Sequence, residues 1–135
     1  MNSTTLWIAQ SLVSAFLGVL FLQSGLDKVL DWKGNREYIT GYFAKTPLKA
    51  LTGPMFVSIT ILEVLTGVLS AAGSVTVVLT QRPNVAFLGA VLAGVTILGL
   101  FFGQRLAKDY AAAAGMVPYA LYSLLAILVL GYRGF

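Results

Sequence analysis

The sequence predicts an all-α membrane protein, a bundle of four transmembrane helices with a short interfacial helix between the first and second spans. Hydrophobic residues make up 58% of the 135 residues and charged residues only 10%. The mean hydropathy is +0.86. So few polar side chains cannot coat a water-soluble domain of this length, and residues 1–135 are predicted to form one membrane-embedded domain.

Four apolar stretches approach the ~20 residues that a helix needs to cross a bilayer. The predicted spans cover about residues 6–26, 54–72, 85–106 and 116–132. Pro54 and Pro118 stand near the starts of the second and fourth spans, where a helix tolerates proline best. Gly73 offers a stop for the second helix, but the apolar run 74–80 could continue it, so its end stays open.

Small side chains recur at helical intervals and predict where the helices meet. They are Ser11, Gly18 and Gly25 in the first span, Gly89, Ala93, Gly99 and Gly103 in the third, and Ser123 and Gly131 in the fourth. In lipid, small residues let helix backbones approach closely, which supplies the association that hydrophobicity cannot. These stripes predict a compact bundle but no specific activity.

The connection between the first two spans is too apolar for a free loop. Tyr38, Ile39, Tyr42 and Phe43 recur at helical spacing, and Pro47 ends the segment. Amphipathic rings favour the depth of the lipid head groups. We therefore expect a short helix lying on the membrane, and a lid over a substrate is the alternative.

The cations predict the orientation of the bundle. The first connection carries Lys28, Lys33, Arg36, Lys45 and Lys49, the third Arg105 and Lys108, the second only Arg82 and the C-terminus only Arg133. Because cytoplasmic loops carry an excess of Lys and Arg, the first and third connections are predicted to face the cytoplasm, with both termini on the periplasmic, outer side. Charge that follows topology in this way indicates contact with membrane lipid, and no nucleic-acid partner is expected.

Two absent residue types limit the chemistry. The chain contains no cysteine and no histidine. It therefore has no disulfide, no thiolate metal site and no imidazole ligand, and it lacks the side chain best suited to proton transfer near neutral pH. We expect no metal, no covalently bound cofactor and no catalysis by this chain alone.

Glu63 is the only ionisable side chain between Lys49 and Arg82, and it lies near the middle of the second span. An acidic group at the bilayer midplane costs about 2.5–3.5 kcal/mol on insertion scales, so it needs a partner or water. Thr60 and Gly67 share its helical face, which points the carboxyl toward protein rather than lipid. Candidate partners near the ends of neighbouring spans are Gln23, Asp27 and Lys28 after the first and Gln104, Arg105 and Asp109 after the third.

Three roles for Glu63 are open on this basis. The first is a structural ion pair or hydrogen bond that fixes the register of the bundle. The second is a cofactor-binding site in which Lys28, Glu63 and Arg105 bind the polar head of a quinone or lipid. Tyr110 or Tyr119 would complete that site. The third is a proton relay that serves a redox or transport partner.

Two short motifs lie in the first and second spans. Gly25-x-x-Lys28 is part of the run FLQSGLDKV at 21–29, and Glu63-x-x-x-Gly67 is part of ILEVLTG at 61–67. Together with the four-span hydropathy, these motifs resemble the DoxX family of small bacterial membrane proteins. The resemblance covers nearly the whole chain.

The resemblance implies a four-helix bundle of the bacterial inner membrane that is associated with oxidoreductase systems. The function expected on this basis is that of an accessory or structural subunit of a respiratory or other electron-transfer complex, with other membrane subunits as partners. Two alternatives stay open. One is a quinone-linked oxidoreductase subunit that binds a quinone head near Glu63, and the other is a small transporter or lipid-handling protein.

Overall fold

Four helices of the chain are long and apolar enough to cross a membrane, as the sequence predicts. In this computed structural model, which describes residues 2–132, they cover Ser3–Leu30, Lys49–Thr80, Asn84–Leu106 and Tyr110–Gly131. The protein is therefore a multi-pass membrane protein of four spans. Arg133, one of the cations on which the predicted orientation depends, lies outside the described residues.

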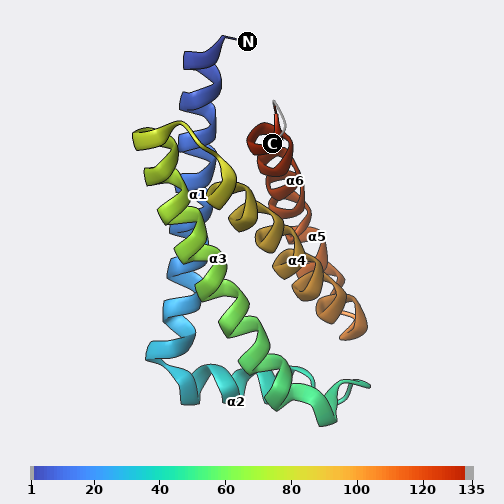
Figure 1. Cartoon of the computed structure of the whole chain (residues 1–135). Helices are drawn as coiled ribbons and strands as arrows, with labels where there is room; N and C mark the ends of the chain where they lie inside the picture. Colours follow the sequence, from blue (N-terminus) through green and yellow to red (C-terminus); the bar gives the residue numbers. More distant parts are fainter. Residues whose placement is uncertain (1, 133–135) are drawn as a thin grey trace.

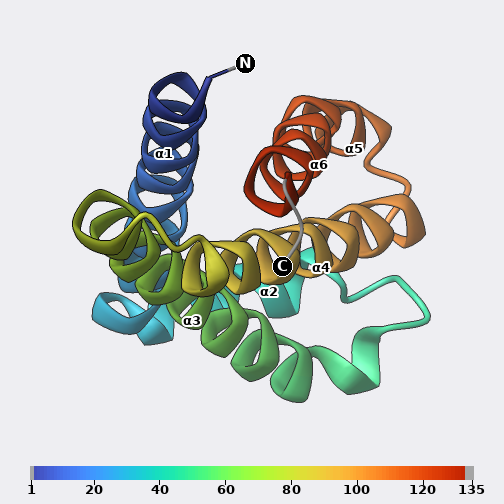
Figure 2. The same ribbon diagram turned by 45° about the horizontal axis from the view of Figure 1, so that its top comes forward.

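The individual helices follow one another with short connections. In chain order they are α1 (Ser3–Leu30), α2 (Trp32–Tyr42), the 3₁₀-helix η1 (Lys49–Leu51), α3 (Thr52–Thr80), α4 (Asn84–Leu106), α5 (Tyr110–Gly115) and α6 (Val117–Gly131). Packing runs from α1 to α3, from α3 to α4 and from α4 to α6 (Figures 1 and 2). The start of α1 and the end of α6 lie at one end of the bundle, and α2 crosses the opposite end (Figure 1).

The first span is longer than predicted because the polar residues after Leu26 continue the helix. The side chain of Asn2 caps its start by accepting a 2.8 Å hydrogen bond from the backbone N–H of Thr5. Asp31 then separates α1 from α2, and its carboxylate caps α2 by accepting from the backbone N–H of Gly34 at 3.3 Å. The predicted interfacial helix is confirmed, although it begins at Trp32 and ends at Tyr42, before Pro47.

The end of the second span, which the sequence leaves open, lies beyond Gly73. The helix α3 continues to Thr80 and ends where Gln81 adopts a left-handed conformation with φ of 58°. Gly73 is a contact with α4, since an added Cβ would lie 2.4 Å from the Cα of Ala86. The glycine therefore serves helix packing and not termination.

Most of the predicted small-residue contacts are present. A Cβ added at a glycine would meet the backbone of the neighbouring helix at 3.2 Å or less for four pairs: Gly18 with Ala71, Gly25 with Val64, Gly67 with Leu22 and Gly89 with Ser70. Gly99 is different. No atom lies within 4 Å of a Cβ added there, so the packing role predicted for Gly99 is wrong, because α3 and α4 diverge at this level.

Hydrogen bonds between helices add to this packing. The indole N–H of Trp7 on α1 donates to the carbonyl of Val77 on α3. The amide of Gln10 donates to the carbonyl of Val129 on α6 at 3.1 Å, which joins the first and last spans. Such bonds stabilise helix association where water does not compete.

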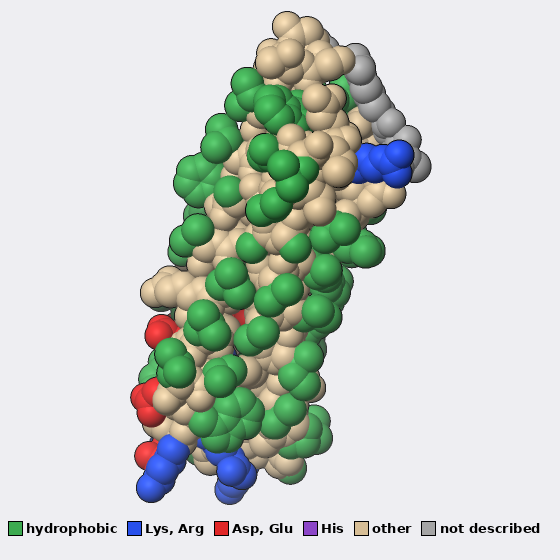
Figure 3. All heavy atoms as spheres, turned by 60° about the vertical axis from the view of Figure 1, so that its left-hand side comes forward, with side chains coloured by type: hydrophobic (Ala, Val, Ile, Leu, Met, Phe, Trp, Pro, Cys, Tyr) green, Lys and Arg blue, Asp and Glu red, His purple; other side chains and the backbone are tan. Residues whose placement is uncertain are grey.

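The outer surface suits a bilayer. Large apolar side chains are exposed along the spans, among them Val19 at 71% and Leu128 at 71%. Figure 3 shows hydrophobic side chains over the length of the molecule, with cationic and acidic ones gathered mainly at the lower, α2 end. Lipid contact follows from this surface, whereas the side of the membrane that each end faces stays a prediction.

Candidate functional site

Glu63 lies in a buried polar contact between α1 and α3. Its side chain is 2% exposed, and its Oε2 lies 2.8 Å from the Nζ of Lys28. The hydroxyl of Ser24 donates to the same oxygen at 3.1 Å. The Lys28 ammonium also donates to the Ser24 hydroxyl at 3.2 Å, so the three side chains form a closed set of interactions.

Two glycines bring these groups together. Ser24 and Lys28 are four residues apart and therefore share a face of α1. Gly25 lies between them, and a Cβ there would be 2.8 Å from a methyl group of Val64. On α3, Gly67 approaches the backbone N of Leu22, only 2.6 Å from where its Cβ would be. Close contact of the two backbones thus sets the distance between the Lys28 and Glu63 side chains.

The structure brings together two of the three site residues proposed from the sequence. Lys28 pairs with Glu63. Arg105, at the end of α4, instead places its guanidinium 4.7 Å from the ring centroid of Tyr110. A cofactor-binding role for Lys28, Glu63 and Arg105 stays a prediction. Ser24 was not among the predicted partners, although its place one turn before Lys28 could have indicated it.

A second candidate site is a cavity of about 520 Å³ between α2, α3 and α4. Its walls are mostly apolar and come from Tyr38, Ile39, Tyr42 and Phe43 near α2, Met55, Phe56, Ile59 and Leu62 of α3, and Gly99, Leu100 and Gln104 of α4. Phe43 is buried and packs on Gly103, where a Cβ would lie 3.3 Å from the ring. The interfacial helix α2 therefore covers one side of the cavity, and the cavity lies outside the bundle core.

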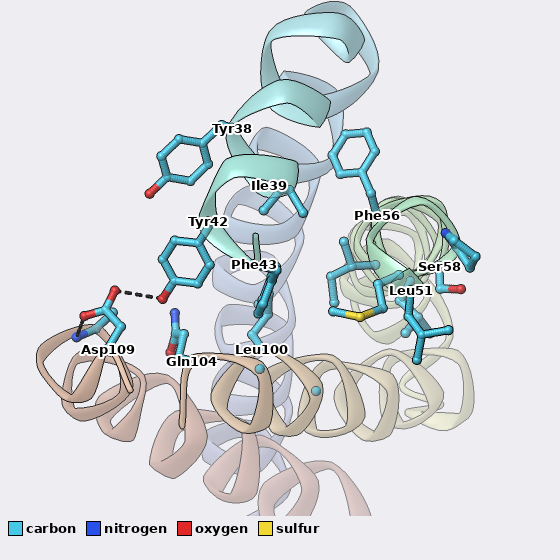
Figure 4. A pocket seen from close by; sticks show the side chains of 17 residues that line it. Tyr38, Ile39, Tyr42, Phe43, Leu51, Phe56, Ser58, Leu100, Gln104 and Asp109 are labelled. Atoms are coloured by element: carbon cyan, nitrogen blue, oxygen red, sulfur yellow. Dashed lines mark hydrogen bonds between the residues drawn. The ribbon is translucent and has the colours of Figure 1, made fainter. Parts of the chain in front are cut away.

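Tyr42, Gln104 and Asp109 lie together at one end of this cavity (Figure 4). The hydroxyl of Tyr42 donates to Oδ2 of Asp109 at 2.7 Å. The other carboxylate oxygen of Asp109 caps α5 by accepting from the backbone N–H of Ala112 at 3.2 Å. Beside them, Oε1 of Gln104 is buried and has no hydrogen-bond partner within residues 2–132.

The electrostatics of this end follow from the Tyr42–Asp109 pair. Burial, and then the hydrogen bond and negative charge of Asp109, raise the pKa of Tyr42 to about 12. The phenol thus stays protonated at neutral pH and serves as a hydrogen-bond donor to the carboxylate.

The opposite end of the cavity opens sideways between α3 and α4. Ser58 and Gly99 line it and are exposed, and Leu51 is 52% exposed at its rim. Ser58 and Gly99 lie within the second and third spans, so this opening faces the hydrocarbon of the bilayer. The cavity thus has a polar end near the interface and an apolar mouth toward lipid.

The sequence singled out the polar residues of this cavity but did not predict that they lie together. Gln104 and Asp109 were predicted as partners of Glu63, and Tyr42 was predicted as an interfacial ring. The proximity of Tyr42 to Gln104 and Asp109 depends on the path that the chain takes from α2 to η1. No sequence motif specifies that path. The one usable signal was Asp109 itself, a helix-capping residue type at the start of α5.

Together, the fold and these sites define a small α-helical membrane protein with four spans and a lipid-facing cavity. Comparison with protein-family models, with curated proteins and with solved structures finds no match to this chain.

Proposed function

We propose that this membrane protein binds an amphipathic small molecule, with a polar ring and a hydrocarbon tail, in the cavity between α2, α3 and α4. The observation that carries the proposal is the combination of apolar walls with a polar end formed by Tyr42, Gln104 and Asp109. Binding pockets for small molecules typically have roughly 300–1,000 Å³ and a few placed polar groups in an apolar lining. The cavity, at about 520 Å³, has this character.

The position of the cavity orients such a molecule. Its tail would leave between Ser58 and Gly99 into the bilayer, and its head would lie under α2 at the interface. Aromatic side chains flank the head, since the rings of Tyr42 and Phe43 lie 4.9 Å apart and those of Tyr38 and Tyr42 6.0 Å apart. This arrangement supports binding of a planar head by ring contacts.

The proposal is tested with a photoreactive probe. An alkylphenol with a diazirine in its tail is added to the full chain in lipid vesicles, irradiated, and its attachment sites are mapped by mass spectrometry. We expect labelling concentrated in residues 51–62 of α3 and 99–104 of α4. Even labelling around all lipid-facing helices would contradict the proposal.

A matched pair of glycine variants sharpens this test. Gly99 lines the cavity and a Cβ added there meets no atom within 4 Å, so Gly99→Leu adds volume at the cavity wall without disturbing a helix contact. Gly115 is likewise open, but it lies outside the cavity lining. Gly99→Leu should abolish the concentrated labelling, and Gly115→Leu should retain it. Equal labelling of both variants would rule out the cavity as the binding site.

The resemblance to the DoxX family supports a second candidate function, an accessory subunit of an electron-transfer complex of the bacterial inner membrane. The observation in its favour is that α2 and short connections are the only described segments outside the spans. Such a chain contributes helix surface to its partners. Purification in mild detergent should then recover stoichiometric partner subunits, and a lone monodisperse species would count against it.

The quinone alternative at Glu63 has a separate test. Glu63→Gln keeps the size of the side chain and removes its charge. If the polar head of a quinone binds at Lys28 and Glu63, quinone-dependent turnover of the assembled complex should fall while assembly is retained. Unchanged turnover would exclude this site and leave the cavity as the place for a quinone-like ligand.

A further inference from the structure

The polar end of the cavity is rich in hydrogen-bond acceptors. The single O–H of Tyr42 is already committed to Asp109. The carboxylate of Asp109 accepts from Tyr42 and from Ala112, which uses two of the roughly four sites of an ionised carboxylate. The Oε1 of Gln104 also lacks a partner within the described residues, but it is fully buried, so the acceptor sites that a ligand can reach are those of Asp109.

The same end carries the carboxylate of Asp109. Within residues 2–132, the Asp109 carboxylate has no salt-bridge partner, and the nearby Arg105 places its guanidinium on the Tyr110 ring. An anionic head group placed at this end would lie against the carboxylate, and like charges repel. A head group that only accepts hydrogen bonds would leave the open acceptor sites of the Asp109 carboxylate unfilled.

Resting on the proposed function, we infer that the cavity selects a ligand whose head is an uncharged ring hydroxyl, such as a phenol or the reduced, hydroquinone form of a quinone. The hydroxyl donates to the free acceptor sites of Asp109, while Tyr38, Tyr42 and Phe43 contact the ring. An anionic phospholipid is disfavoured by the same carboxylate.

The inference is tested by competition against the photoreactive alkylphenol with three compounds that share one decyl tail. They are a decylphenol, its methyl ether and decyl phosphate. Because a hydrogen bond to a charged acceptor is lost in the ether, the phenol should compete at least about tenfold better than the ether. Decyl phosphate should be the weakest competitor. An ether or phosphate that competes as well as the phenol overturns the inference.

Two aspartate variants identify the group responsible. Asp109→Asn removes the charge but keeps a residue that caps α5, so the helix start is preserved. This variant should bind the phenol several-fold more weakly and the phosphate more tightly. Asp31→Asn is the control, since Asp31 also caps a helix, α2, but does not line the cavity. An Asp109→Asn variant with the selectivity of the unmodified protein would also overturn the inference.

The labelling pattern separates this inference from the proposed function. If the probe labels the cavity but the three competitors act equally, the choice of head group is wrong and the cavity is still a binding site. If the probe does not concentrate in the cavity, both statements fall.

Discussion

The ammonium of Lys28 lies 2.8 Å from the carboxylate of Glu63, and a glycine on each helix permits this approach. The Lys28 side chain is 17% exposed and that of Glu63 is 2% exposed, so the pair reaches from the edge of the bundle into its interior. A buried charge with a partner and a hydrogen-bond donor is tolerated in a span where an isolated one is not. The pair therefore accounts for how an acidic residue is accommodated at this depth.

Removing one member of the pair should destabilise the bundle. Lys28→Met leaves the Glu63 charge unpaired, and the free energy of unfolding should fall by about 3 kcal/mol, as for other broken buried pairs. Unfolding in mixed detergent micelles measures this loss. The double variant Lys28→Met, Glu63→Met should recover most of it, because no charge then remains buried.

Lys33→Met is the control for that experiment. Lys33 is an exposed residue of α2, so its replacement should change the free energy of unfolding by less than about 0.5 kcal/mol. If Lys28→Met is no more harmful than Lys33→Met, the ion pair does not stabilise the bundle.

Two glycine-to-alanine substitutions should have opposite signs. At Gly73 the new methyl group would lie 2.4–2.6 Å from the backbone and Cβ of Ala86, so α3 and α4 must move apart. We expect a loss of about 1–3 kcal/mol, typical of overpacking. At Gly99 nothing lies within 4 Å, and alanine should stabilise the helix by about 0.5–1 kcal/mol. Thermal unfolding in detergent compares the two, and equal shifts would contradict the distinction between these glycines.

The Tyr42–Asp109 contact predicts a titration at high pH. Burial and the negative charge of Asp109 raise the pKa of Tyr42 from 10.0 to about 12. Because the unfolded chain loses this proton first, the stabilisation from Tyr42 is fully present below pH 10.0 and declines as the pH rises through about 12. Ultraviolet absorbance of tyrosinate, compared with Tyr42→Phe, isolates this residue. In Asp109→Asn the pKa should move back toward 10.0, and an unchanged value would show that Asp109 has no influence.

The predicted orientation can be measured directly, because the chain contains no cysteine. Gly41→Cys places a thiol on exposed α2 in open space, and Thr5→Cys places one at the exposed start of α1. If the α2 end faces the cytoplasm, a membrane-impermeant maleimide added to intact cells should label Thr5→Cys and spare Gly41→Cys. The reverse pattern would invert the predicted topology.

Local pattern predicted the spans and the interfacial helix because each depends on residues close together in the chain. Apolar runs of sufficient length determine where the chain crosses a bilayer, and the spacing of Tyr38 and Tyr42 determines an amphipathic helix. The helix end at Gln81 was not predictable in this way. A glycine such as Gly73 can stop a helix or pack against another one, and the choice depends on whether Ala86 lies opposite.

The same distinction between local sequence pattern and tertiary structure applies to the candidate sites. The sequence by itself determined that Glu63 must face protein and find a partner, because a lone carboxyl in a span is costly and its helical face carries small residues. Only the tertiary structure decided that the partners are Lys28 and Ser24 and that Arg105 stacks elsewhere, since this depends on how α1 crosses α3. It also decided that α3 and α4 diverge beneath α2, which brings Tyr42 to Asp109 across 67 positions of chain and opens the cavity beside Gly99. Contacts over such separations follow from helix crossings, and no local pattern of residues specifies them.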